Sequence, residues 1–168
     1  MAQTVRTRPT LFDFPDPVNE ISARLVAAGV VLMSLTILVF GQTWLIPVLA
    51  YGFVARVLTG PTLSPLGSVV TKVITPRLPI APRPTPGPPK RFAQGIGATL
   101  SVSAAIAHFG FGATTPALVL VGMILVAASL EAFVGYCLGC KIFGLLMRAG
   151  IVPESVCEAC NNLSLRHA

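Results

Sequence analysis

The sequence predicts an all-α membrane protein, a four-span transmembrane helical bundle with an interfacial amphipathic helix at its cytoplasmic face. Three observations predict this fold class. The 168-residue chain is 54% hydrophobic and only 11% charged, whereas an ordinary soluble domain is about 25% charged. Four apolar runs approach the length of about 20 residues that a helix needs to cross the hydrocarbon core. Basic residues gather between alternate runs, as they do in cytoplasmic loops.

Residues 1–20 are polar and contain proline, and we expect them to form a cytoplasmic tail. Acidic residues precede the first apolar run, so the chain does not begin like a cleavable secretory signal. The first span is predicted at 21–40. Arg24 lies one turn inside it, from where its long side chain can reach the headgroups.

A tight turn at 41–43 leads to a short second span, predicted at 44–58. Trp44 and Arg56 are expected at opposite interfaces, where aromatic and basic side chains anchor membrane helices. Pro47 falls inside this span, which membrane helices tolerate better than soluble helices do.

An interfacial helix is predicted at 64–75, because Ser64 is a good N-cap and Pro65 suits the first helical position. Its apolar residues recur with helical spacing on one face: Leu66, Val69, Val70, Val73 and Ile74. We expect this face to lie on the bilayer surface; packing on a protein partner is the alternative. Seven prolines in the next fourteen residues predict a stiff, extended linker at 76–89.

The third span is predicted at 92–108 and the fourth at 116–136, with the apolar run continuing to Leu146. Lys90 and Arg91 precede the third span and are expected to anchor its orientation. Within that span Gln94 is expected to bond another helix, and His108 to have a structural role at the outer interface. Together these spans define a transmembrane domain at 21–148.

Loop charge predicts the orientation of the bundle. The turns at 41–43 and 109–115 carry no Lys or Arg, whereas both tails and the connection between the second and third spans carry several. The positive-inside rule therefore places both termini in the cytoplasm and the protein in the inner membrane. The net charge of +6 does not indicate nucleic-acid binding, because the basic residues form no stripe with interleaved aromatics.

Two C-x-x-C pairs carry the chemistry that the sequence suggests: Cys137 with Cys140, and Cys157 with Cys160 in a C-terminal segment at 149–168. The pairs are separated by sixteen residues, a spacing typical of zinc sites, and four thiolates could close a tetrahedral structural site. The competing interpretation is thiol–disulfide exchange or sulfur transfer, in which a thiolate attacks a sulfur and its neighbour resolves the intermediate. Both interpretations stand beside the possibility of four merely small, buried residues.

Cys137 is expected late in the fourth helix, where the negative end of the macrodipole disfavours a thiolate. Lys141 could offset this effect, and Gly135 and Gly139 could loosen the helix. Glu131 is the only acidic residue inside a predicted span. An intramembrane acid suggests function: a proton relay to the thiols or, in an oligomer, small-solute transport. The alternative is a protonated Glu131 bonded to a serine or a backbone carbonyl.

Three segments resemble a bacterial membrane family catalogued as domain of unknown function 4395: Ser64-Pro65-Leu66-Gly67, Arg91-Phe92-Ala93-Gln94 and, most specifically, Gly135-Tyr136-Cys137-Leu138-Gly139-Cys140. The resemblance implies the four-span fold and a role for the Cys137/Cys140 pair. It also implies an association with a soluble thioredoxin-like or rhodanese-like protein. The predicted function is therefore a membrane thiol redox or sulfur-relay component, with a zinc-clamped, non-enzymatic membrane protein as the alternative.

Overall fold

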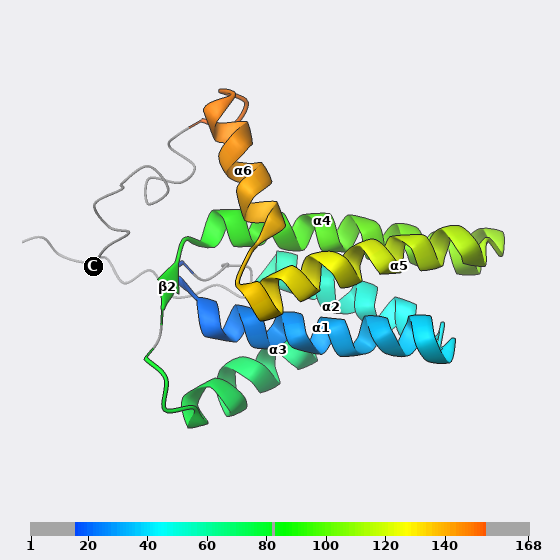
Figure 1. The fold of residues 1–168 in the computed structure, drawn as a ribbon, viewed down its shortest axis with the longest axis horizontal. Helices are drawn as coiled ribbons and strands as arrows, with labels where there is room; N and C mark the ends of the chain where they lie inside the picture. Colours follow the sequence, from blue (N-terminus) through cyan, green and yellow to red (C-terminus); the bar gives the residue numbers. More distant parts are fainter. Residues whose placement is uncertain (1–15, 82, 154–168) are drawn as a thin grey trace, which may run out of the picture.

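A computed structural model describes residues 16–81 and 83–153, and its centre is a bundle of four helices (Figure 1). The helices α1, α2, α4 and α5 lie side by side, with α4 against α2 and α5, and α1 against α5. Their bounds are Glu20–Phe40, Leu45–Thr59, Gly87–Ala105 and Thr114–Ser129. Single π-helical segments, η3 (Ile106–Gly110) and η4 (Leu130–Val134), prolong α4 and α5.

Local signals in the sequence explain where α1 begins and ends. The Asn19 side chain accepts a hydrogen bond from the Ile21 N–H and so caps one of the free donors of the first turn. Gly41 ends the helix with a φ of 66°, a left-handed conformation that costs a glycine little. The turn that follows is short, and α2 begins at Leu45 and packs mainly on α4.

The buried core runs along the middle of the bundle and is aliphatic except for Phe53. A Cβ on Gly97 would overlap the Phe53 ring, so this glycine lets α4 approach α2 closely. The other core residues are Val30, Val31, Ile37, Ile46, Leu49, Ala104, Ala117, Val121, Ile124 and Ala128.

Three helical segments are long and apolar enough to cross a membrane: Glu20–Phe40, Gly87–Gly110 and Thr114–Val134. The apolar helix Leu45–Thr59 is shorter. Large apolar side chains also point away from the bundle; Leu32 is 67% exposed and Val126 is 62% exposed. Such surfaces are costly in water but suit lipid. The chain is an all-α membrane protein.

A second helical unit packs outside the bundle and consists of α3 (Pro65–Val69), η1 (Val70–Ile74) and η2 (Thr75–Arg77). Ser64 caps it by accepting from the Gly67 N–H. The residues predicted on one apolar face differ in how far they are buried. Val70 is buried, and Leu66 would meet a Cβ on Gly29 of α1, whereas Val69, Val73 and Ile74 remain exposed.

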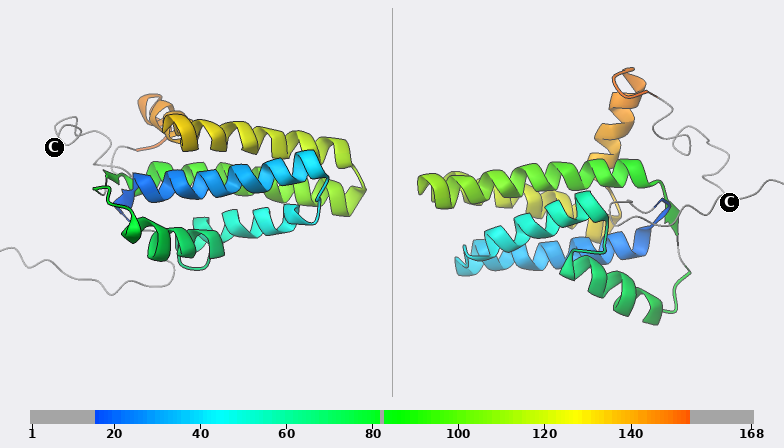
Figure 2. Two further views of the ribbon diagram at one scale, coloured as in Figure 1. Left: turned by 60° about the horizontal axis from the view of Figure 1, so that its bottom comes forward. Right: turned by 180° about the vertical axis from the view of Figure 1, so that it is seen from behind.

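The end of the bundle at which α1 and α4 begin carries two further features (Figure 2). Strand β1 (Val18–Asn19) pairs antiparallel with β2 (Pro84–Thr85), which ties the start of α1 to the start of α4. The helix α6 (Leu138–Arg148) projects steeply from the bundle axis. The predicted proline-rich linker 76–89 is shorter than expected, because Pro88 and Pro89 form the first turn of α4, where prolines are tolerated.

Candidate functional site

The C-x-x-C pair lies at a break between two helices. Gly135 ends η4 with a φ of 72°, and its N–H and that of Tyr136 bond the carbonyls of Glu131 and Leu130. Cys137 is extended, and α6 begins at the next residue. The expectation that Cys137 lies late in the fourth helix is therefore wrong. A left-handed glycine stops the helix, which a run of apolar residues does not reveal.

Cys137 and Cys140 are joined by a disulfide, with their Cα atoms 5.2 Å apart. Cys137 is the N-cap of α6, and its Sγ accepts a hydrogen bond from the Cys140 N–H over 3.3 Å. This sulfur thus lies at the positive end of a helix, which favours a thiolate when the pair is reduced. The expected macrodipole effect on Cys137 is reversed.

Close packing on α4 positions the pair. A Cβ on Gly139 would lie 2.6 Å from the Cα of Ala93, so the two backbones touch where α6 starts. One turn further, the Phe143 and Phe92 rings pack with their centroids 5.6 Å apart. Cys137 is only 9% exposed beneath these contacts, whereas Cys140 is partly exposed. The helix α6 packs mainly on α4, so few contacts determine how accessible Cys137 is.

Glu131 pairs with Lys90, with 2.5 Å between the Lys90 Nζ and the Glu131 Oε1. Their side chains are only 15% and 10% exposed, respectively. The predicted partners of Glu131 were a serine or a backbone carbonyl, and Lys90 was expected only as a topology anchor. Sequence reasoning missed this pair because it does not reveal which turns of α4 and η4 face each other.

Arg56 is the other buried cation of the bundle and is only 5% exposed. It was expected at a membrane interface. Its Nε donates to the Gln94 Oε1 over 3.0 Å, which confirms that Gln94 bonds another helix. Its guanidinium carbon lies 4.5 Å from the Phe53 ring centroid, and within the described part of the chain its Nη1 has no hydrogen-bond partner. Its position fifteen residues after Gly41 placed it at the end of a span, and only the packing of α4 shows that it is covered.

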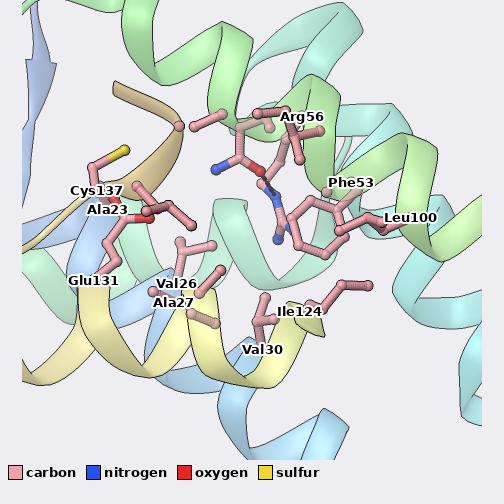
Figure 3. A pocket seen from close by; sticks show the side chains of 18 of the residues that line it. Ala23, Val26, Ala27, Val30, Phe53, Arg56, Leu100, Ile124, Glu131 and Cys137 are labelled. Carbon is pink, nitrogen blue, oxygen red and sulfur yellow. Dashed lines mark hydrogen bonds between the residues drawn. The ribbon is translucent and has the colours of Figure 1, made fainter. Parts of the chain in front are cut away.

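A cavity of about 100 Å³ lies between α1, α2, α4, α5 and the η4–α6 break (Figure 3). Glu131 and Cys137 lie on one side of it, and Arg56 lies beside Phe53 on the other. The remaining wall is mostly apolar, with Val26, Val30, Leu100 and Ile124 among its residues. The structure therefore brings two of the predicted site residues, Glu131 and Cys137, to one mostly apolar cavity and adds Arg56 and Gln94 to them.

Arg24 contributes to the same end of the bundle. Its Nε and Nη2 donate to the Ala132 carbonyl, and Nη2 also donates to the Phe133 carbonyl, over 3.0–3.2 Å. These carbonyls belong to the last turn of η4, where a cation complements the helix dipole. Arg24 was predicted to reach the lipid headgroups; it instead holds the turn that leads to Cys137.

Two predicted parts of the site are not combined with this cavity. Cys157 and Cys160 lie outside the described residues. Within the described ranges, no three His, Cys, Asp or Glu side chains form a group that could hold a metal ion. His108 lies at the opposite end of the bundle, where its Nδ1 is 3.1 Å from the Thr114 Oγ1.

Comparison with known proteins gives a single match. The family model described as domain of unknown function (DUF4395) matches residues 18–148, a region that includes the helix bundle, the Cys137–Cys140 pair and α6. Neither a curated protein nor a solved structure matches the chain. The family match covers most of the sequence and agrees with the motifs at Ser64, Arg91 and Gly135. The chain belongs to the family described as domain of unknown function (DUF4395).

Proposed function

We propose that this protein is an integral membrane thiol–disulfide exchange component whose reactive pair is Cys137 and Cys140. One observation carries the proposal: the two sulfurs are disulfide-bonded, with Cys137 as the N-cap of α6. Cysteine pairs at a helix N-terminus are activated there because the helix favours the thiolate. A pair that served only as half of a zinc site would need both sulfurs as free thiolates.

In the proposed reaction, the reduced Cys137 thiolate attacks a disulfide of a soluble partner and displaces one partner thiolate. The Cys140 thiolate then attacks the Cys137 sulfur, which re-forms the internal disulfide and releases the second partner thiolate. Two electrons pass to the partner, and the protons lost by the pair are taken up by the released thiolates. Exchange is reversible, so a dithiol partner can reduce the same pair.

The C-terminal pair, Cys157 and Cys160, is proposed to exchange with the internal pair and with the soluble partner. A thioredoxin-like or rhodanese-like protein is the partner class implied by the family resemblance. Glu131 is proposed as a positioning residue, because its ion pair with Lys90 joins α4 to the turn that precedes Cys137. Cys137 is almost covered, so the partner reaches it when α6 moves away from α4.

We further propose that α2 is the fourth span, that the exposed face of α3 and η1 lies on the bilayer surface, and that the disulfide end faces the cytoplasm of a bacterial inner membrane. The fifteen residues of α2 pack within the bundle, and Trp44 lies at its uncharged end. Reporter fusions after Thr59 and Arg148 should both indicate the cytoplasm, and a fusion at Gly112 the opposite side. A reporter after Arg148 on the outer side would overturn the proposed site of exchange.

Trapping tests the exchange reaction. Cys140→Ser leaves the attacking sulfur without its resolving neighbour, so a mixed disulfide with the partner accumulates. Cys137→Ser is the matched control, because it removes the attacking N-cap sulfur and leaves the Cys140 sulfur three residues later in place. We expect a disulfide-linked adduct on non-reducing gels for Cys140→Ser, and likewise for Cys160→Ser, but not for Cys137→Ser. Equal behaviour of the two internal variants would contradict the assigned roles.

A further inference from the structure

The buried charges around the cavity do not balance. Among the described residues that line it, only Arg56 and Glu131 are charged. Glu131 already pairs with Lys90 at 2.5 Å, so two cations share one carboxylate in a covered region of the bundle. Among the described residues, the groups that contact the Arg56 guanidinium are the Gln94 amide and the Phe53 ring, and both are neutral. A buried cation that shares its counter-charge with a second cation is costly in such surroundings.

The guanidinium lies beside the Phe53 ring where the cavity wall is formed (Figure 3). Arg56 is only 5% exposed, and its Nη1 has no hydrogen-bond partner among the described residues. Water in a cavity of about 100 Å³ could accept that hydrogen bond. Water does not supply the missing negative charge, whereas a bound anion supplies both.

We propose that this cavity binds one small monovalent anion through Arg56 Nη1, beside the Gln94 amide. A cavity of about 100 Å³ has room for a small polyatomic anion. The wall is mostly apolar, and Val26, Val30, Phe53 and Ile124 contribute to it. Such a wall replaces little of an anion's hydration, so the site favours weakly hydrated ions such as thiocyanate or nitrate over strongly hydrated sulfate and phosphate. This binding does not depend on the proposed thiol exchange.

Titration calorimetry with sodium thiocyanate tests the proposal, using the full chain in neutral phosphatidylcholine nanodiscs and gluconate as the only other anion. We expect saturable binding with one site per chain, displaced by nitrate but not by sulfate. Arg56→Met should weaken binding about 10- to 100-fold, the loss expected for one charge-assisted hydrogen bond. Arg77→Met is the matched control, because it removes an exposed cation outside the cavity.

Arg56→Lys keeps the charge and provides a second variant if Arg56→Met does not fold. It should bind thiocyanate with at most a moderate loss of affinity, and Gln94→Leu, which leaves the cation in place, should do the same. Wild-type protein that shows no saturable binding would overturn the proposal. So would equal binding by Arg56→Met and wild type, or equal losses from Arg56→Met and Arg77→Met, because either outcome would assign the binding to the surface.

Discussion

At one end of the bundle the chain reverses direction in short turns without a charged residue, whereas the other end holds every charged side chain that the structure describes. The uncharged end is made by Gly41 and Gly112, both with a φ of 66°, and by exposed aromatic rings. The charged end holds an ion pair, a capped helix terminus, a strand pair and a disulfide. The length of the helices determines where the chain turns. Polar contacts between the helices determine which chemical groups are held together at each end.

The difference extends to how each end tolerates its polar groups. His108 at the uncharged end bonds Thr114 near the surface, where water or headgroups can replace either partner. Lys90, Glu131 and Arg56 are nearly covered, so Lys90 and Glu131 depend on each other, and Arg56 depends on Gln94 and the Phe53 ring. Polar substitutions of similar size should therefore have unequal effects at the two ends.

Glu131→Leu should have the largest effect, because it leaves Lys90 buried without a counter-charge. We expect a loss of about 3–5 kcal/mol in the free energy of unfolding, measured by denaturant titration in mixed micelles. His108→Leu, the control at the opposite end, should change stability by less than about 0.5 kcal/mol. Because replacing both partners removes the unpaired charge, Lys90→Met combined with Glu131→Leu should recover much of the loss. Equal effects of the two single substitutions would contradict the contrast between the ends.

Gly139→Leu should have a smaller effect on stability but a clear effect on thiol access. A side chain here meets the Ala93 backbone, so α6 must move away from α4 at a cost of about 1–3 kcal/mol. After reduction, Cys137 should react faster with maleimide. Gly144→Leu is the matched control, since a Cβ there meets nothing within 4 Å. Unchanged labelling in Gly139→Leu would show that α6 does not limit access to Cys137.

Much of the bundle can be predicted from composition and capping residues. The first helix begins and ends within a residue of its predicted bounds, and Ser64-Pro65 starts a helix as expected. Each of these features depends on neighbours in the sequence. The break at Gly135 could not be predicted in the same way, because glycine is common inside membrane helices and the apolar run continues to Leu146.

The site was harder to predict because it depends on which helix faces cross. Cys137 and Glu131 were identified by their residue type, but the Lys90 partner follows only from the packing of α4 on η4. From the sequence, Arg56 was predicted to be an interface anchor. In the structure it is buried, because α4 packs on α2. The sequence of a membrane helix does not reveal which face contacts which neighbour, because the lipid-facing and the buried surfaces are both apolar.

Counting thiols and zinc in anaerobically purified wild-type protein tests the central claim most directly. Maleimide mass shifts before and after a soluble dithiol would give the redox state of each cysteine, and elemental analysis would give the metal. The account predicts a Cys137–Cys140 disulfide that releases two thiols on reduction and re-forms with a protein disulfide, without stoichiometric zinc. One zinc per chain, held by four reduced cysteines and lost equally on replacing any one of them with serine, would contradict it.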